Sequence, residues 1–292
     1  MDNSKSAGQS MAPIRIFENF DLRTLYLEQM IRSLTRFDYT DEFVVVRPDP
    51  GNFFRGMLIR ALTSFLRGRG IELVRRRKFD AGTRRLGRDW PINADTMVGV
   101  ERLKNICECV RTVVEDGIPG DLVETGVWRG GAAIMMRAAL EAYGDRTRRI
   151  WCADSFEGLP APELDRYPQD EGMVWHLHPE LAISLQQVQA NFDKYGFLDN
   201  RVSFLKGWFK DTLPEAPIGE ISILRLDGDL YSSTMDSLES LYFKVSKGGF
   251  VIVDDYGIDE DTCRRAVNDF RATHDISAPI IDIDGYGAYW RR

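Results

Sequence analysis

The sequence is poor in the side chains that build disulfide frameworks and zinc sites. Its 292 residues include only 3 histidines and 4 cysteines. A chain of this length with so few cysteines does not resemble a disulfide framework, so we expect four reduced thiols that pack in the interior. The shortage of histidine also argues against a zinc site made of His and Cys.

An excess of positive charge and a long apolar run are also absent. The 38 Lys and Arg residues are outnumbered by 45 Asp and Glu residues, which leaves a net charge of −7. This balance disfavours nucleic acid as the main partner. No apolar run approaches the roughly 20 residues that a membrane helix needs, and the polar start has no apolar signal core. We therefore expect a cytoplasmic protein with no nucleic-acid or membrane partner.

The chain divides into three regions. Residues 1–20 begin Ser-, Gln- and Asn-rich and are predicted to be disordered. Residues 21–94 carry helical patterns over Leu22–Leu34 and Phe53–Leu66 and then a stretch rich in arginine, from Arg67 to Arg88. That stretch is interpreted as a solvated helix face or a subunit contact, or alternatively as a lid that attracts an acidic substrate.

Residues 95–292 alternate between strand and helix patterns. The expected strands are Leu122–Thr125, Arg149–Ala153, Val202–Lys206, Ile221–Leu226 and Phe250–Val253. The expected helices between and after them are Ala132–Tyr143, Ala182–Tyr195, Ser232–Val245 and Asp261–His274, preceded by a helix that ends near Glu115. Near-continuous apolar strands predict a doubly wound, mostly parallel sheet covered on both faces, and Ile280–Arg291 predicts a terminal antiparallel hairpin.

A glycine-bearing loop follows the first of these strands. Glu124 ends the apolar run, and Gly126 to Gly131 leads into a helix. This is a strand-loop-helix unit suited to close approach of a cofactor. The G-x-G-x-x-G spacing of a pyrophosphate loop is missing, and bulky Trp128 and Arg129 occupy the loop. A strand-end carboxylate suits a cofactor with a cationic head, and S-adenosylmethionine carries an ammonium group.

Two further strand ends carry candidate cofactor contacts. Asp154, which closes the second strand, can accept hydrogen bonds from ribose hydroxyls, although it could also be a simple helix or turn cap. After the third strand, Gly207 permits close approach and Trp208 or Phe209 could form a wall for an adenine ring. Aromatic pairs at such positions are also common in protein cores.

Acidic residues gather after the fourth and fifth strands. Asp227 and Asp229 follow one strand, and Asp254 and Asp255 follow its expected neighbour. Asp227, Asp254 and Asp255 would repel one another unless a cation shared them, and oxygen ligands without His or Cys favour Mg²⁺ or Ca²⁺. Asp229 would then be free to act as a general base. The competing interpretation is that these residues cap the following helices.

Two of the histidines form an H-x-H pair in the long loop after the second strand. His176 and His178 could supply a base or a metal ligand. Surface histidines without such a role are more common.

Several long motifs in this order resemble the macrocin O-methyltransferase family, whose members are Mg²⁺- and S-adenosylmethionine-dependent enzymes that methylate sugar hydroxyls on glycosylated antibiotics. The resemblance extends from about residue 22 to the C-terminus. The matching stretches are Leu25–Glu28, Asp89–Pro91, Asp95–Gly99, Val123–Gly131, Asp154–Pro160, Lys206–Pro214, Leu226–Thr234 and Asp254–Tyr256.

The resemblance implies a seven-stranded class I methyltransferase (Rossmann-like) sheet and a set of site residues. Thr96 and Met97 would contact the methionine end of the cofactor, and residues 124–131 would hold its amino acid moiety. The implied cofactor-binding residues are Thr96, Met97, Glu124, Thr125, Gly126, Val127, Trp128, Arg129, Asp154, Ser155, Phe156, Gly207, Trp208, Phe209 and Asp227. The implied metal ligands are Asp227, Asp254 and Asp255, with Asp229 and Asp227 as catalytic residues, or a histidine as the base.

The resemblance also implies a homo-oligomer, a dimer or larger, and an N-terminal helical lid. Residues 44–77 are longer and more basic than expected for the family, and they fall where a lid would shape the acceptor pocket. We expect a glycoside as the acceptor, with a catechol as the nearest variant. A nicotinamide-dependent oxidoreductase and a non-catalytic binding protein are the alternatives from other classes.

Overall fold

The centre of the molecule is a seven-stranded sheet, as predicted. The structure is a computed structural model that describes residues 21–39, 41–46, 53–257 and 262–292, so the disordered N-terminus predicted for residues 1–20 lies outside the described residues. The strand order is β5-β4-β3-β6-β7-β9-β8. The strands are β3 (Asp121–Thr125), β4 (Ile150–Asp154), β5 (Val202–Lys206), β6 (Ile221–Leu226), β7 (Val245–Val253), β8 (Ile281–Asp282) and β9 (Ala288–Arg291).

The pairing of the strands confirms a doubly wound sheet with a terminal antiparallel hairpin. Strands β5, β4, β3, β6 and β7 pair in parallel, whereas β9 runs antiparallel to both β7 and β8. The chain reverses its winding at β3, which has β4 on one side and β6 on the other. In such sheets ligands bind outside the carboxyl ends of the strands at this reversal.

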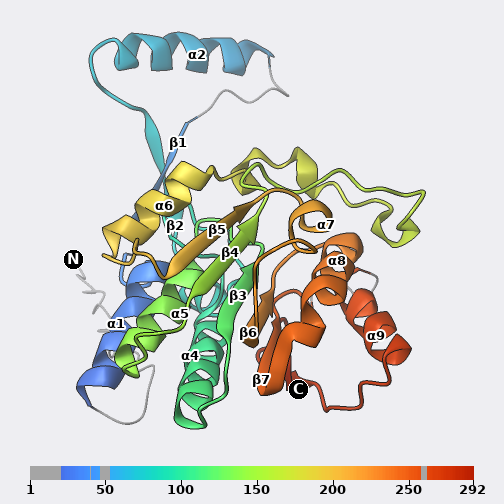
Figure 1. The fold of residues 1–292 in the computed structure, drawn as a ribbon. Coiled ribbons are helices and arrows are strands. Elements are labelled where there is room, and N and C mark those ends of the chain that lie inside the picture. The colour runs from blue at the N-terminus through green and yellow to red at the C-terminus, as the bar shows by residue number, and fades with distance from the viewer. Residues whose placement is uncertain (1–20, 40, 47–52, 258–261) are drawn as a thin grey trace, which may run out of the picture.

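Helices cover both faces of the sheet (Figure 1). One face packs against α4 (Val100–Glu115), α5 (Gly131–Ala142) and α6 (Leu185–Lys194), and α1 (Leu22–Thr35) packs on α4 and α5. The other packs against α8 (Tyr231–Leu241) and α9 (Cys263–Thr273), with the short α7 (Phe209–Thr212) beside them. Leu122 of β3 points into the first core and Val123 into the second, which explains why the strands are apolar at successive positions.

Three element boundaries differ from the predicted ones by three residues or more. The helix expected over Ala182–Tyr195 begins only at Leu185, because Ser184 caps it by accepting the N–H of Gln187. The helix expected to reach Val245 ends at Leu241 and is followed by a 3-10 turn. Strand β7 begins at Val245 rather than at Phe250, since its two glycines lie within a register irregularity instead of a turn.

The region before residue 95 contains a hairpin that was not predicted. Strands β1 (Asp41–Val45) and β2 (Val74–Lys78) pair antiparallel and form the stem of α2 (Phe53–Arg67), which stands away from the body in Figure 1. The short helix α3 (Ala81–Arg85) follows. The interpretation of the basic stretch as a solvated helix face is therefore wrong for Arg75–Lys78, which lie in a strand.

Other parts of that basic stretch are also structural. Arg84 is only 2% exposed and donates hydrogen bonds to Asp89 and to the carbonyl of Thr35. Four apolar side chains of α2, in contrast, are open to solvent. Met57, Leu58, Leu62 and Phe65 are 54%, 68%, 47% and 57% exposed.

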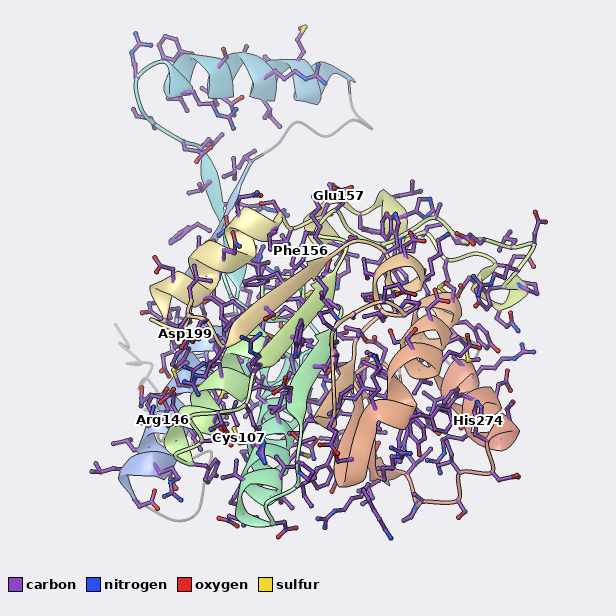
Figure 2. The ribbon with its side chains drawn as sticks, viewed as in Figure 1. Cys107, Arg146, Phe156, Glu157, Asp199 and His274 are labelled. Carbon is purple, nitrogen blue, oxygen red and sulfur yellow. The ribbon has the colours of Figure 1, made fainter. Side chains whose placement is uncertain are left out.

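The four cysteines lie in the interior, and the third histidine, His274, lies at the end of α9. All four thiols are free and buried, as expected. His274 lies at the end of α9, where its ring packs against Phe243 and Phe270, and Figure 2 shows it far from Phe156 at the end of β4. Within the described residues, no helix combines the length and apolar character needed to cross a membrane.

Candidate active site

Two adjoining cavities open at the carboxyl edge of the sheet. The Trp208 cavity, of about 300 Å³, is lined by residues that include Asp154, Ser155, Gly207, Trp208 and Phe209. The Asp255 cavity, of about 260 Å³, is lined by residues that include Thr96, Glu124, Trp175, Asp254 and Asp255. Both are lined by Met97, Val127, Trp128, Leu181, Asp227 and Asp229. The predicted site residues from five strand ends thus meet in one connected region.

The ends of β3 and β6 approach so closely that only glycine fits between them. Gly126 has φ +88°, and a Cβ built on it would lie 1.6 Å from the carbonyl oxygen of Asp227. The N–H of Asp227 donates to the carbonyl of Thr125 over 2.8 Å. This contact fixes the backbone of Asp227 at the wall that the two cavities share, while Thr125 itself is buried beneath it.

The bulky residues of the glycine-bearing loop hold its surroundings in place. Trp128 lies in the left-handed region at φ 46°, and its indole N–H donates to the carbonyl of Glu180 over 3.0 Å. The Arg129 guanidinium donates to three carbonyls of the preceding segment, those of Pro91, Ile92 and Ala94. Arg129 therefore anchors the segment that leads to Thr96 and Met97, whereas Trp128 lines both cavities.

The segment from Asp95 to Met97 is held against the first turn of α5. A Cβ on Gly131 would lie 2.4 Å from the carbonyl oxygen of Asp95, so this approach also depends on glycine. The Asp95 carboxylate accepts hydrogen bonds from Lys194 (2.6 Å) and Tyr195 (2.8 Å) of α6 and its C-cap. Thr96 lines the Asp255 cavity, and Met97 lines both cavities.

Asp154 is held by backbone N–H groups at the mouth of the Trp208 cavity. Its oxygens accept the N–H of Val127 (2.7 Å) and of Phe156 (2.6 Å). Burial raises the pKa of Asp154, and these N–H donors reduce but do not cancel that rise. The ring of Phe156 packs against Phe204 with centroids 6.2 Å apart, so it supports the site from the core rather than lining the cavity.

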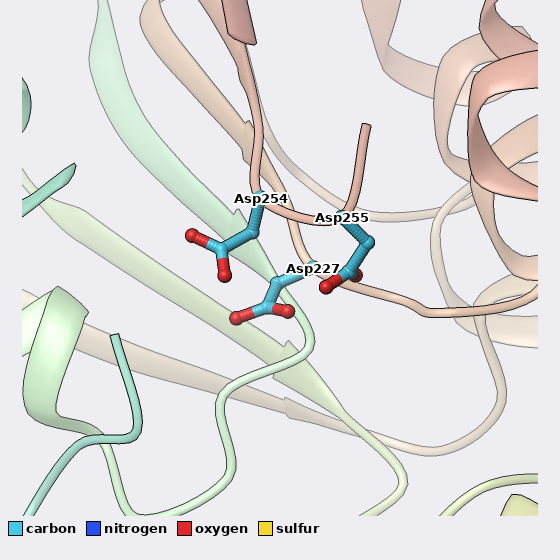
Figure 3. Close-up of side chains that lie close together, drawn as sticks. All are labelled: Asp227, Asp254 and Asp255. Atoms are coloured by element: carbon cyan, nitrogen blue, oxygen red, sulfur yellow. The ribbon is translucent and has the colours of Figure 1, made fainter. Parts of the chain in front are cut away.

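The three carboxylates of the predicted metal site converge. Asp227, Asp254 and Asp255 each offer an oxygen, and these atoms all lie within 4.8 Å of one another (Figure 3). Asp254 and Asp255 are 5% and 6% exposed, while the side chain of Asp227 is 26% exposed. The cluster therefore has one open side, which faces the two cavities.

Two buried arginines compensate part of this negative charge. Arg225, on β6, donates hydrogen bonds to Glu124, Asp227 and Asp254. Arg102, on α4, donates to the other oxygen of Asp254 and to Asp284. Each oxygen of Asp254 therefore faces a different guanidinium group, which fixes the orientation of its carboxylate.

The pKa of Asp254, which pairs with both arginines, shifts in the opposite direction from the pKa values of its acidic neighbours. Burial pushes the pKa of Asp254 upward, but the charges of Arg102 and Arg225 outweigh it and the net pKa is lowered. Burial and the charges of Asp229 and Asp227 raise the pKa of Asp255 well above its usual range. Burial also raises the pKa of Glu124, to about 8. The two arginines therefore keep Asp254 ionised, whereas burial opposes the ionisation of Asp255 and Glu124.

Asp229 occupies a strained position at the boundary of the cavities. It lies in the left-handed region at φ 57°, a conformation that is costly for a residue with a side chain and common at functional sites. Its backbone N–H donates to Asp255 over 3.2 Å. Burial and the nearby charges of Asp227 and Asp254 raise its pKa to about 7. A carboxyl group with such a pKa can take a proton near neutral pH.

The H-x-H pair lies outside both cavities. His176 is exposed, and neither it nor His178 is among the lining residues of the two cavities. The ring of His178 packs on Trp90 and Trp175 with centroid distances of 5.4 and 5.5 Å. This geometry favours Asp229 over either histidine as the group next to a bound acceptor.

Several functional residues were missed by sequence reasoning. Arg225 interrupts an apolar strand, and that charge in a buried position was a readable signal. Arg102 and Asp170 gave no local signal, because their partners lie far away in the sequence. Both oxygens of the buried Asp170 accept N–H groups at the start of α8, those of Tyr231 (2.7 Å) and Ser232 (3.1 Å).

Comparisons with known proteins agree with the resemblance. Residues 23–292 match the model of the macrocin-O-methyltransferase (TylF) family. The 8-demethyl-8-(2,3-dimethoxy-alpha-L-rhamnosyl)-tetracenomycin-C 4'-O-methyltransferase of Streptomyces olivaceus is 59% identical over 213 residues, 73% of this chain and 81% of that protein. The mycinamicin III 3''-O-methyltransferase of Micromonospora griseorubida is 48% identical over 223 residues, 75% of this chain and 87% of that protein.

The solved structure of the O-methyltransferase NovP has a TM-score of 0.78 to this chain. It is 45% identical and covers 92% of this chain and 99% of its own. These matches show that the chain is an O-methyltransferase that belongs to the macrocin O-methyltransferase family.

Proposed function

We propose that the chain transfers a methyl group from S-adenosylmethionine to a sugar hydroxyl of a glycosylated secondary metabolite, in a Mg²⁺-dependent reaction. The observation that carries this proposal is the position of the carboxylate cluster. Asp227 and Asp229 line both cavities, so a donor that extends from the Trp208 cavity into the Asp255 cavity would meet an acceptor beside them.

The Trp208 cavity suits the adenosyl part of the cofactor. Asp154 has lone pairs left to accept ribose hydroxyls, and Trp208 and Phe209 offer aromatic faces to adenine. The methionine end would extend past Met97 and Thr96 toward the glycine-bearing loop.

Glu124 is the strongest candidate for the cationic head of the donor. Its Oε2 is buried and has no hydrogen-bond partner among the described residues, and the residue lines the Asp255 cavity. A buried carboxylate oxygen without a partner is costly, and the ammonium of the methionine moiety would satisfy it.

The donor set of the cluster fits Mg²⁺. The convergent ligands are all carboxylate oxygens, which hard divalent cations prefer. Burial, together with the charges of neighbouring carboxylates, raises the pKa values of Asp227 and Asp255, and a dication would offset both effects. When bound, Mg²⁺ would orient neighbouring oxygens of the acceptor and make the loss of a hydroxyl proton easier.

The chain's own residues account for the proton and the alignment. The Asp229 carboxylate would accept the proton of the acceptor hydroxyl. The acceptor oxygen would then form a bond to the methyl carbon as the carbon–sulfur bond breaks, leaving a neutral thioether on the donor. Most of the acceleration would come from alignment and from fixed charges.

The relatives support a glycoside as the acceptor. The Streptomyces olivaceus relative is a 4'-O-methyltransferase of a rhamnosyl-tetracenomycin, and the Micromonospora griseorubida relative is a mycinamicin III 3''-O-methyltransferase. A catechol remains the nearest alternative, since its vicinal hydroxyls would suit the same cluster. For a nicotinamide cofactor the carboxylate cluster would have no purpose.

The decisive experiment is a screen of candidate glycosides with isotopically labelled S-adenosylmethionine, with MgCl₂ and with excess EDTA. We expect labelled product only with the divalent ion. Full turnover in EDTA would refute the metal requirement. Calorimetry that detects NAD binding but no S-adenosylmethionine binding would refute the methyl-transfer function.

We further propose a cytoplasmic homo-oligomer, a dimer or larger. The four free thiols favour a reducing compartment. The exposed apolar side chains of α2 favour a subunit contact, because such a stripe on a protruding helix is costly in water. Light scattering of the Leu58→Ser/Leu62→Ser double variant should give a smaller assembly than the wild type if α2 makes that contact.

A further inference from the structure

The Asp255 cavity is lined by aromatic as well as acidic side chains. Trp90 and Trp175 both line this cavity, together with the carboxylates of Asp227, Asp254 and Asp255. The two tryptophans come from separate segments, one ahead of the methyltransferase domain and one in the long loop after β4. A sugar whose hydroxyls reach the carboxylates would therefore have its remaining substituent close to indole rings.

The two indoles lie too close together for a ligand ring to fit between them. Their ring centroids are 6.3 Å apart, with the planes inclined at 39°. A ring inserted between them would need about 7 Å, twice the normal contact distance between carbon atoms. A flat group can therefore only stack on an outward face, and Trp90 is 40% exposed.

Neighbouring residues hold both tryptophans in place. The Arg77 guanidinium, on strand β2, donates to the carbonyl of Trp90 over 2.7 Å. His178 packs against both indoles, and the loop that carries Trp175 is tied to α8 through the buried carboxylate of Asp170. A surface held in this way loses little entropy when a ligand stacks on it.

From this arrangement we propose that Trp90 and Trp175 form a stacking subsite for a planar aromatic aglycone, so that the enzyme selects glycosides whose sugar is attached to an aromatic group. This proposal rests on the proposed function, in which the sugar binds at the carboxylate cluster. It also gives the unusual stem of α2 a role, because Arg77 positions Trp90.

The test compares two acceptors that differ only in the aglycone. The probes are 2-naphthyl α-L-rhamnoside and methyl α-L-rhamnoside, with the same pair made for other deoxysugars. Binding is measured by calorimetry on the full chain with S-adenosylhomocysteine and MgCl₂, and methyl transfer is measured with the labelled donor. The variants are Trp175→Ala and Trp90→Ala, with Trp175→Phe as the conservative replacement.

A matched control lies in the same loop. Leu177 is 68% exposed and does not line the Asp255 cavity, so Leu177→Ala removes an exposed apolar side chain without touching the subsite. Binding of S-adenosylhomocysteine serves as the folding control for every variant.

We expect the wild type and Leu177→Ala to bind the naphthyl glycoside about tenfold more tightly than the methyl glycoside, the upper range for one aromatic contact. The ratio should fall to near one in Trp175→Ala and recover partly in Trp175→Phe. If this affinity ratio is unchanged in both alanine variants and methyl transfer continues, the stacking subsite is refuted and the proposed function stands. A wild type that binds no member of any pair overturns both this subsite and the proposed function.

Discussion

Replacing Asp229 by asparagine tests the assignment of the general base. The side chain lies at the boundary of the two cavities, and its burial among Asp227 and Asp254 raises its pKa to about 7. Asparagine has nearly the same size but cannot accept the proton. General bases contribute about 10²–10⁴-fold to a rate, so kcat should fall by that factor.

The pH dependence gives a second measure of the same group. The base works in its ionised form, so the activity of the wild type should be lost as the pH falls through the pKa of Asp229. A divalent cation nearby stabilises the carboxylate, so with Mg²⁺ the midpoint should lie at or below the value of about 7 that burial produces. The asparagine variant should lack this acid limb.

The assay is steady-state methyl transfer over a range of pH with saturating donor and MgCl₂. Asp211→Asn, the same change at an exposed carboxylate outside both cavities, is the control. Mn²⁺ binding should persist in Asp229→Asn. An unchanged kcat with an intact acid limb would refute the assignment and move the role to His176 or His178.

Three further predictions concern the frame of the site. Asp170→Ala should weaken S-adenosylmethionine binding by several fold and speed hydrogen exchange in residues 159–181, because two N–H groups of α8 lose their acceptor; unchanged exchange would contradict this. Gly126→Ala should abolish stable folding, since its Cβ would lie 1.6 Å from a carbonyl oxygen, and a normal melting temperature would contradict the close approach. The pKa values of Asp229 and Glu124 are raised to about 7 and about 8 in the folded protein. Their protonated forms therefore stabilise the folded state in acid, and this stabilisation is lost as the pH rises through these values. This contribution to the melting temperature of the metal-free protein should therefore fall from about pH 4 to about pH 8. MgCl₂ should raise the melting temperature more at about pH 8 than at about pH 5; equal stabilisation at both pH values would count against metal binding to these carboxylates.

The edge of the sheet could be predicted because parallel strands bring their carboxyl ends together. Asp154, Asp227 and Asp254 each follow an apolar run, and that position alone places them at one rim. The same reasoning explains why the convergence of Asp227, Asp254 and Asp255 was predicted and is confirmed as geometry. Whether the cluster binds Mg²⁺ stays a prediction.

The parts that could not be predicted depend on contacts between distant segments. Strand β2 reads Val-Arg-Arg-Arg-Lys, which has no alternation of apolar and polar residues, and only its pairing with β1 makes it a strand. The contact of Trp90 with Trp175 and the capping of α8 by Asp170 join segments that no local pattern connects. The family resemblance implied that Arg129 contacts the cofactor, and no local pattern indicated the hydrogen bonds that its guanidinium donates to three carbonyls.

Titration of the protein with Mn²⁺, followed by electron paramagnetic resonance, tests the central claim most directly. Mn²⁺ prefers the same hard oxygen ligands as Mg²⁺ and is visible in this measurement. We expect one ion to bind per wild-type chain and per Asp211→Asn chain, and binding to weaken by more than about tenfold in Asp255→Asn. A wild type that leaves all of the Mn²⁺ free, or an Asp255→Asn variant that binds it as the wild type does, would contradict a cation site among these carboxylates.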